Sequence, residues 1–542
     1  MADSALLLVT IFTPLVGACL VSIVSPYGAR CVRWVALVTT LLVLLLASLT
    51  VARFPADGAE ASSFTTDIVW LQANQIAVHF NVGLDGLGLW MFGLSSLLML
   101  TAVLVSWEAI KDRPALFYGM LLLLECGCLG VFTARDIMLF YVFFEFTLIP
   151  LFFLIGIWGS ESRLYASTKF FLFTLAGSVL TFLGLLAIVV LTAQSSGEVT
   201  FSIPRLTELL AAHPLSPSHQ LWIFLALFAG FAIKVPLFPV HTWLPLAHVQ
   251  APTAGSVFLA GVLLKIGTYG FVRFNLPLLP DASAVCMPWL LWLAAIGIVY
   301  GSLVALAQTD MKKLIAYSSV AHLGFCMIGL FSMNRLGMHG GVLQMINHGI
   351  STGGLFAVIG MTYERYHTRE IASLGGLTRK LPILSFFMVV FTLSSISLPG
   401  TNGFSGEFLI LLGIFQRAFD GAAPPGDLAW QFQAIALLTL SGVVLGAWYM
   451  LTLVQKVFFG PLKEPHAGPG EHHPVHDLSL REIAALAPLV VFVVWIGLFP
   501  QFFLDRMAPT LNDLQAASAQ SLEQNYAEAA TAAAEENATR VR

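Results

Sequence analysis

The chain has 542 residues, of which 58% are hydrophobic and only 10% are charged. These values and a mean hydropathy of +0.85 exclude an ordinary soluble domain and predict a protein that crosses a membrane many times. The net charge of −4 excludes the strongly basic balance that is typical of nucleic-acid binding. The six cysteines show no CxxC spacing, and no Gly-rich nucleotide loop is present, so we expect neither a metal nor a redox cofactor in this chain.

Apolar stretches of about 20 residues, the length needed to cross the hydrocarbon core, recur along the whole chain. They predict fourteen transmembrane helices in an all-α polytopic fold. The first stretch follows an acidic residue, Asp3, and lacks a clear cleavage site, so we expect it to be retained rather than removed as a signal peptide. The expected spans are residues 4–25, 32–53, 84–107, 114–133, 136–158, 166–193, 220–240, 250–274, 286–307, 313–332, 339–362, 382–418, 431–457 and 482–504.

Two of these spans contain helix-breaking residues. In the seventh, Lys234 is followed by Pro236 and Pro239, and in the twelfth the segment SLPGTNGFSGE (397–407) interrupts the apolar run. The two spans are five apart and must cross in opposite directions, which indicates inverted repeats. We expect four regions: helices 1–3 in residues 1–113, a first repeat of helices 4–8 in 114–274, a second repeat of helices 9–13 in 286–457, and a loop, helix 14 and a short C-terminal tail in 458–542.

The distribution of Lys and Arg predicts how the chain is oriented, because loops on the cytoplasmic side carry more of them. Fifteen of the 26 fall in loops on one side, nine fall on the other, and Lys234 and Lys265 lie inside the membrane. Both termini are then expected on the periplasmic side. For the His-rich tract 463–478, a solvated loop is favoured over a metal-binding segment.

Lys234 and Lys265 each lie in an otherwise apolar helix. An ammonium at bilayer depth is disfavoured by about 3 kcal/mol on insertion scales, so such a residue indicates a function by default. Lys234 sits beside the break in span seven, and broken helices next to buried charges form the ion sites of many transporters. Lys265 has long apolar flanks, which argue against snorkelling to the interface and suit a proton relay.

Glu145 is a carboxylate at the centre of the fifth span, where it would be protonated or paired. Lys234 is its natural partner, because the break in span seven lets this lysine approach span five. The pair has two interpretations: a static ion pair that holds two helices together, or a switch whose opening changes the proton affinity of the lysine. We favour the switch, because losing a carboxylate contact at about 4 Å changes the energy by about 4 kcal/mol at an effective dielectric constant near 20.

Three further ionisable groups continue this line through the second repeat. His322 and His348 lie near the middle of adjacent spans, and Glu407 follows the break in span twelve. A single membrane histidine is often only a packing residue, but two on neighbouring helices between Lys265 and Glu407 favour a proton relay. Glu125 in the fourth span is a further isolated carboxylate, for which a structural role is equally open.

Five sequence blocks carry a resemblance to a known family. The chain resembles the antiporter-like membrane subunits of respiratory complex I, the proton-pumping NADH:quinone oxidoreductase, and among them the subunit M (chain 4) branch. The blocks are FFEFTLIPLFFLIGIWG (143–159), KVPLFPVHTWLPLAHVQAPTAGSVFLAGVLLKIGTYG (234–270), YSSVAHLGF (317–325), HTREIASLGGL (367–377) and LPGTNGFSGEFLILLG (398–413). The block at 398–413 is the most discriminating, because the sister branches L and N carry lysine at the position of Glu407.

The resemblance implies fourteen helices in two inverted five-helix repeats with discontinuous helices 7 and 12. It places FMN, iron–sulfur clusters and quinone in partner subunits, and it gives subunits L, N and K as membrane neighbours in the bacterial inner (plasma) membrane. It also implies a coupling role for Glu125. The proton-relay roles that it implies fall on Glu145, Lys234, Lys265, His322, His348 and Glu407.

Three alternatives remain open. A subunit of a multi-subunit sodium/proton antiporter would use similar lysines, but the LPGTNGFSGE and HTRE segments favour complex I. A hydrogenase-type membrane arm is a weaker alternative. A purely structural anchor for an oxidoreductase predicts that neutralising the buried lysines leaves pumping intact, and an anchor has no need for two buried lysines and two broken helices.

Overall fold

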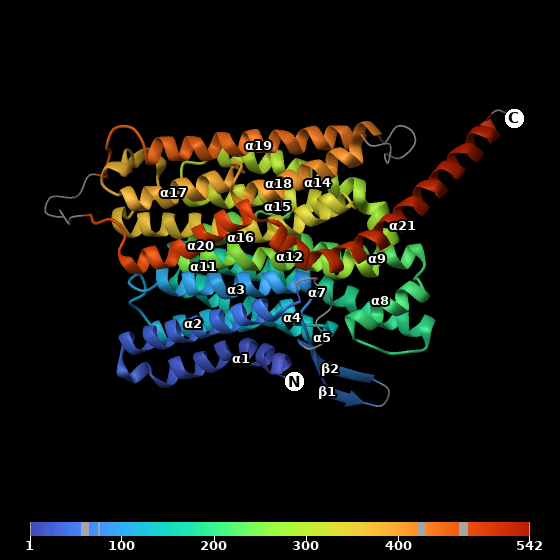
Figure 1. Ribbon diagram of the computed structural model, residues 1–542, viewed down its shortest axis with the longest axis horizontal. Helices are drawn as coiled ribbons and strands as arrows, with labels where there is room; N and C mark the ends of the chain where they lie inside the picture. Colours follow the sequence, from blue (N-terminus) through green and yellow to red (C-terminus); the bar gives the residue numbers. More distant parts are fainter. Residues whose placement is uncertain (1, 56–63, 74–75, 420–428, 466–474, 541–542) are drawn as a thin grey trace.

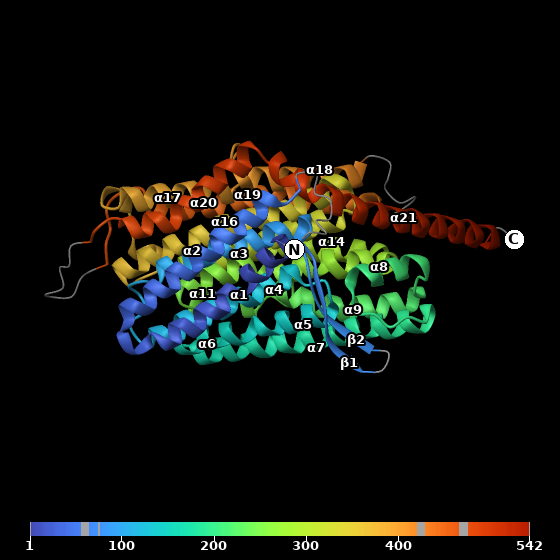
Figure 2. The ribbon, with the colours of Figure 1, turned by 60° about the horizontal axis from the view of Figure 1, so that its bottom comes forward.

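The computed structural model describes residues 2–55, 64–73, 76–419, 429–465 and 475–540. Its helices lie side by side in one bundle, and their ends gather at two opposite faces (Figures 1 and 2). Within the described residues, 12 helical segments are long and apolar enough to cross a membrane. Two interrupted helices, α9–α10 and α17–α18, bring the number of crossings to fourteen, so the predicted all-α polytopic fold is confirmed.

The N-terminal region contains three crossing helices and a two-stranded antiparallel hairpin that the sequence did not lead us to expect. Asp85 follows the hairpin and caps the third helix, because its carboxylate accepts a hydrogen bond from the backbone N–H of Gly88 at 2.8 Å. The elements are α1 (Ala2–Ile23), η1 (Ser25–Tyr27), α2 (Ala29–Arg53), β1 (Thr66–Ala73), β2 (Ile76–Val82) and α3 (Gly86–Val105).

The first repeat is built around the predicted break in the seventh crossing helix. α9 ends at Lys234, and the indole N–H of Trp243, the first residue of α10, donates to the carbonyl of Ile233 at 2.9 Å. This bond satisfies one of the carbonyl groups that every helix end leaves without a partner. The elements up to this point are α4 (Pro114–Thr133), α5 (Ile137–Phe146), α6 (Leu148–Trp158), α7 (Arg163–Ser196), α8 (Ile203–Ala212), α9 (Pro217–Lys234) and α10 (Trp243–Gln250).

The eighth crossing helix is not uniformly α-helical. Two π-helical turns flank a short central α-helical segment, and this segment carries Lys265. Such turns are rare in proteins and occur frequently at functional sites. In chain order the segments are α11 (Thr253–Phe258), η3 (Leu259–Leu263), α12 (Leu264–Gly270), η4 (Phe271–Asn275) and α13 (Leu276–Leu278).

The second repeat contains the second predicted break, between α17 and α18. The hydroxyl of Ser394, near the end of α17, donates to the side-chain oxygen of Asn402, the first residue of α18, and so ties the two halves together. The elements are α14 (Pro280–Leu306), α15 (Met311–Phe331), α16 (Arg335–Tyr366), η5 (Ile371–Ser373), η6 (Leu377–Arg379), α17 (Pro382–Ser395), α18 (Asn402–Phe419), α19 (Ala429–Val457) and α20 (Leu480–Leu498).

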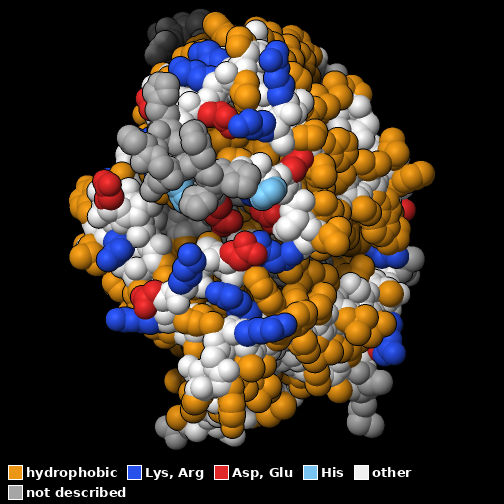
Figure 3. Space-filling view, turned by 90° about the vertical axis from the view of Figure 1, so that its left-hand side faces the viewer, with side chains coloured by type: hydrophobic (Ala, Val, Ile, Leu, Met, Phe, Trp, Pro, Cys, Tyr) orange, Lys and Arg blue, Asp and Glu red, His pale blue; other side chains and the backbone are white. Residues whose placement is uncertain are grey.

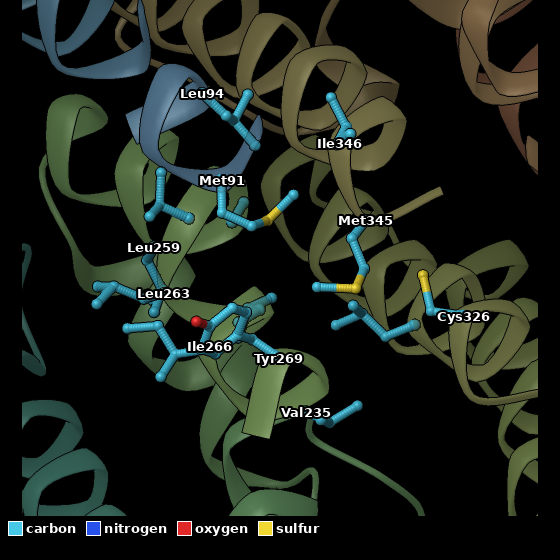
Figure 4. Packing of buried hydrophobic residues seen from close by; sticks show 14 of the residues in the cluster. Met91, Leu94, Val235, Leu259, Leu263, Ile266, Tyr269, Cys326, Met345 and Ile346 are labelled. Carbon is cyan, nitrogen blue, oxygen red and sulfur yellow. The ribbon is translucent and has the colours of Figure 1, made fainter. Parts of the chain in front are cut away.

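The centre of the bundle is formed by α3, the eighth crossing helix, α15 and α16, which are buried along almost their whole length. Figure 4 shows this packing: Met91 of α3 faces Leu259 and Leu263, and Met345 of α16 closes the opposite side. By contrast, α1, α2, α7 and α19 expose many apolar side chains on the outside of the bundle. An apolar exterior is what contact with lipid requires.

One end of the bundle gathers exposed lysines and arginines (Figure 3). We call it the basic face; it is formed by the α3–α4, α6–α7 and α14–α15 connections and by the ends of α16 and α19. Its exposed cations include Lys111, Arg163, Lys313, Lys380 and Lys463. The opposite face carries the β-hairpin, α8 and the start of α19 (Figure 1).

The C-terminal segment differs from the prediction of a short tail. α21 (Gln501–Arg540) is a single helix of 40 residues, which corresponds to about 60 Å at 1.5 Å per residue. Its first half packs against the bundle, where Met507 and Leu511 are buried, and its C-terminal half projects away from the bundle (Figure 1). The prediction of a short tail was wrong, because the Ala and Glu residues that fill this segment have high helix propensity and continue a helix that is already nucleated at Gln501.

Candidate functional site

Lys265 is completely buried in the eighth crossing helix. Its ammonium donates to the carbonyl oxygen of Ala260, in the π-helical turn that precedes it. The same nitrogen lies 2.7 Å from Nδ1 of His348, on α16. Within the described residues, no carboxylate forms an ion pair with this lysine, so its direct polar partners are a carbonyl group and an imidazole.

From His348 the series of ionisable groups continues across α15 to α18. The imidazole rings of His348 and His322 lie with their centroids 5.5 Å apart. His322 Nδ1 lies 3.0 Å from Oε1 of Glu407, and the His322 and Glu407 side chains are only 7% and 4% exposed. Four of the predicted site residues therefore form one contiguous buried series: Lys265, His348, His322 and Glu407.

Uncharged polar side chains surround this series, and they are not among the site residues predicted from the sequence. Gln344 donates to Oε1 of Glu407 at 3.0 Å, and Asn347 donates to the backbone carbonyl of Asn402 at 2.7 Å. A small cavity of about 10 Å³ between these groups and the two histidines has room for about one water molecule. A signal was available: Gln344, Asn347, His348 and Ser351 are spaced as one face of α16.

Lys234 is buried at the end of α9, but the structure does not pair it directly with Glu145. Its ammonium lies 4.7 Å from the centroid of the Phe144 ring. Within the part of the chain that the structure describes, Glu145 and Lys234 form no ion pair, and Glu145 is half-buried. The direct contact inferred from the sequence was wrong because neighbouring helix positions point in different directions, and here Phe144 points toward the lysine.

A glycine holds the eighth crossing helix against the break at Lys234. A Cβ atom at Gly267 would lie 2.8 Å from the backbone nitrogen of Val235 and 2.9 Å from Cβ of Lys234. Because real Cβ contacts are never that short, any larger residue at position 267 must push the two helices apart. Gly267 therefore sets the separation between the helices that carry Lys234 and Lys265.

A cavity of about 420 Å³ opens at the basic face, and Thr253 at the start of the eighth crossing helix lines it. Lys312 also lines it and is buried, and its ammonium donates to the carbonyl of Ala251 at 2.6 Å. His248, which does not line the cavity, is fully buried and stacked on Phe356 at 4.5 Å between ring centroids. His248 is within electrostatic range of both Lys312 and Lys265.

Nothing in the sequence singles out Lys312. It belongs to a Lys312–Lys313 pair that follows Asp310 at the start of a crossing helix, and it is one of the fifteen cations that the sequence predicts in loops on the cytoplasmic side. In the structure only Lys313 is exposed. Successive residues on a helix point in different directions, so one member of such a pair can be buried while the other reaches water.

Glu125 lies apart from the series. It is fully buried in α4, and within the described residues neither of its carboxylate oxygens has a hydrogen-bond partner. A buried carboxylate without partners is costly unless it is protonated. The described residues also contain no group of His, Cys, Asp and Glu suited to a metal ion, and most of the His-rich tract 463–478 lies outside them.

Comparison with known proteins places this architecture among respiratory and antiporter membrane subunits. The sequence model of the family described as NADH:quinone oxidoreductase/Mrp antiporter, TM, matches residues 134–421. The NADH-quinone oxidoreductase subunit M of Rhodobacter capsulatus is 41% identical over 94% of this chain and 96% of its own length. The NADH-ubiquinone oxidoreductase chain 4 of Arabidopsis thaliana is 39% identical over 93% of this chain and 96% of its own length.

Solved structures give the same result. A chain of respiratory complex I from Thermus thermophilus superposes with a TM-score of 0.81 and 32% identity, covering 94% of this chain and 99% of that chain. A chain of the Mrp complex from Dietzia sp. has a TM-score of 0.76 at 21% identity, covering 97% of this chain and 98% of that chain. At that identity the second likeness concerns the fold alone.

Proposed function

Because the chain belongs to the NADH-quinone oxidoreductase subunit M family, we propose that it carries protons across the membrane along its buried ionisable series. As a member of this family it is a membrane subunit of an enzyme complex and a multi-pass membrane protein. Protons pass from Lys265 through His348 and His322 to Glu407. Lys234 and Glu145 act before Lys265 in the first repeat, and Glu125 serves in coupling.

The observation that carries the proposal is the unbroken contact series in the second half of the path. Lys265 touches His348 at 2.7 Å, the two histidine rings are neighbours, and His322 touches Glu407 at 3.0 Å. Each of these side chains can bind and release a proton. A one-water cavity beside both histidines supplies a bridge where the rings do not hydrogen-bond directly.

Proton uptake starts at the basic face, which carries the excess of lysine and arginine expected on the cytoplasmic side. The cavity lined by Lys312 leads protons inward, and His248 passes them toward Lys265. With this orientation both termini lie on the periplasmic side of the bacterial inner membrane. Glu407 follows the break in the twelfth helix and releases protons toward that side.

The driving reaction takes place in other subunits of the complex. NADH oxidation at FMN, electron transfer through iron–sulfur clusters and quinone reduction belong to those partners, and this chain converts the energy into proton movement. Subunits L, N and K are its neighbours in the membrane arm.

The experiment that tests the proposal compares two histidines on one helix. His348→Ala interrupts the series and is expected to lower NADH-driven proton pumping by about tenfold or more, because a positioned acid–base group contributes at least that much to a proton transfer. His339→Ala is the matched control, since His339 is also buried on α16 but lies outside the series. Pumping is measured in vesicles that carry the assembled complex. Equal pumping in the two variants would contradict the proposed path.

Glu145→Gln is expected to slow NADH-driven pumping severalfold while the complex still assembles. The substitution removes a charge that acts on Lys234 over a longer distance than a direct ion pair. Assembly should survive, because Glu145 is half-buried and is not held by an ion pair in the described structure. Pumping and quinone reduction are measured together, and normal values for both would remove Glu145 from the path.

A further inference from the structure

The eighth crossing helix ends toward the opposite face in a charged cluster that the path above does not use. Tyr269 lies one helical turn after Lys265, and Arg273 lies one turn further, about 12 Å from Lys265 along the axis. Arg273 meets Asp85, the residue that caps α3. The cluster therefore joins the end of the Lys265 helix to the start of α3.

Hydrogen bonds join the three side chains of this cluster to one another and to the backbone. The guanidinium of Arg273 binds Asp85 with two parallel hydrogen bonds of 2.6 and 2.9 Å, and the two side chains are only 20% and 15% exposed. Arg273 Nε donates to the hydroxyl of Tyr269 at 3.1 Å, and that hydroxyl donates to the carbonyl of Phe132 at 3.4 Å. Asp85 also accepts from Gly88 N, so its position is fixed from two sides.

The two ends of the first repeat differ sharply in the space that they offer to water. At the basic face the cavity beside Lys312 measures about 420 Å³. At the opposite face the cavity lined by Asp85, Tyr269 and Arg273 measures about 30 Å³, which is room for about two water molecules. Tyr269 is 1% exposed, lines this small cavity and lies one helical turn from Lys265.

We propose that Asp85, Arg273 and Tyr269 form a proton seal that closes the periplasmic end of the eighth crossing helix. The seal rests on the proposed proton path, and it gives that path its direction. A proton that reaches Lys265 from the basic face then has only the histidine series toward Glu407 available. Without the seal, Lys265 would exchange protons with both sides and the complex would leak.

The chemistry of the three residues suits a barrier rather than a relay. An arginine remains protonated at all physiological pH values and has no acceptor atom, so it cannot pass a proton on. The Asp85 carboxylate is kept ionised: burial raises its pKa, but the Arg273 guanidinium outweighs burial, and the pKa lies below its usual value. Fixed arginines serve as electrostatic barriers to protons and cations in other membrane pores.

The test is passive proton leak in the absence of turnover. Vesicles carrying the whole complex, without NADH and with quinone reduction inhibited, receive a potassium diffusion potential, and an internal pH dye records proton uptake. Arg273→Gln is expected to raise the leak about tenfold over the wild type, because the guanidinium that binds Asp85 is removed and Asp85 remains as a proton acceptor, with Arg135 as the cation still lining the cavity. The double variant Arg273→Gln/Lys265→Ala is expected to return to the wild-type leak.

The matched control is Arg365→Gln. Arg365 forms a bidentate pair with Glu482, at 2.8 and 2.9 Å, which is of similar geometry and burial but lies at the basic face. Losing that pair disturbs the structure by a similar amount without opening the periplasmic end, so the leak should stay at the wild-type value. If Arg365→Gln leaks as much as Arg273→Gln, the effect is general instability and the seal is wrong.

Two further results would overturn the seal. One is a leak rate in the assembled Arg273→Gln complex that equals the wild-type rate, and the other is a raised leak rate in the double variant Arg273→Gln/Lys265→Ala. If Arg273→Gln does not assemble, Arg273→Lys replaces it, since lysine keeps the positive charge beside Asp85 but can release its proton. It should leak several times more than the wild type, and an assembled Arg273→Lys complex without leak overturns the seal. The proposed proton path is tested by a different variant, since normal pumping in His348→Ala would contradict the path and not the seal.

Discussion

Lys265→Ala is expected to reduce NADH-driven proton pumping to about one tenth of the wild-type rate or less, with the complex still assembled. The reason is the position of the ammonium, which lies 2.7 Å from Nδ1 of His348 and so joins the first repeat to the histidine series. Removing it leaves His348 without a proton donor. Quinone reduction should fall with pumping if the two are coupled.

Lys265→Arg separates a relay from a fixed charge. Arginine keeps the positive charge and can still donate to His348 and to the Ala260 carbonyl, but it does not release its proton at physiological pH. A relay therefore predicts that Lys265→Arg pumps as poorly as Lys265→Ala. Pumping at the wild-type rate in Lys265→Arg would show that only the charge matters, and the relay would be excluded.

The measurement is proton uptake into vesicles after addition of NADH, normalised to the amount of assembled complex. The same preparation gives the rate of quinone reduction. Lys313→Ala is a suitable control, because Lys313 is an exposed cation of the basic face that touches none of the buried series. Its loss should leave both rates close to those of the wild type.

The crossings and the two breaks could be predicted from the sequence because they depend on local properties. Hydrophobic length alone defines a crossing, and a proline or a Pro-Gly segment within it cannot continue an α-helix. The predicted break after Lys234 and the break within 397–407 were both confirmed. The π-helical turns around Lys265 were not predictable, since no residue pattern distinguishes them from an α-helix.

The site was predicted as a set of residue types, and its contacts depended on information that the sequence does not carry. A charged residue in an apolar span stands out from its neighbours, so Lys265, His348 and Glu407 could be found. Which neighbour each one touches depends on the rotation of every helix about its axis. For that reason Phe144 occupies the place expected for Glu145, and Lys312 was mistaken for a surface cation.

Glu407→Gln is expected to lower proton pumping about as strongly as loss of Lys265, while barely disturbing the structure. Oε1 of Glu407 faces both His322 Nδ1 and Gln344 Nε2 at 3.0 Å. The amide oxygen of glutamine can take the same place and accept from the same two donors. What glutamine cannot do is bind a proton from His322 and release it, so the end of the series is blocked.

Glu407→Asp provides the complementary variant, because it keeps the carboxylate and shortens the side chain by one methylene. Its pumping should lie between the wild type and Glu407→Gln, since a shift of about 1 Å weakens a hydrogen-bonded proton transfer without abolishing it. Assembly and pumping are measured for both variants in the same vesicles. If Glu407→Gln pumps normally, protons leave the series before Glu407, and the exit must then be sought at His322, whose Nε2 lies 3.3 Å from the hydroxyl of Ser395.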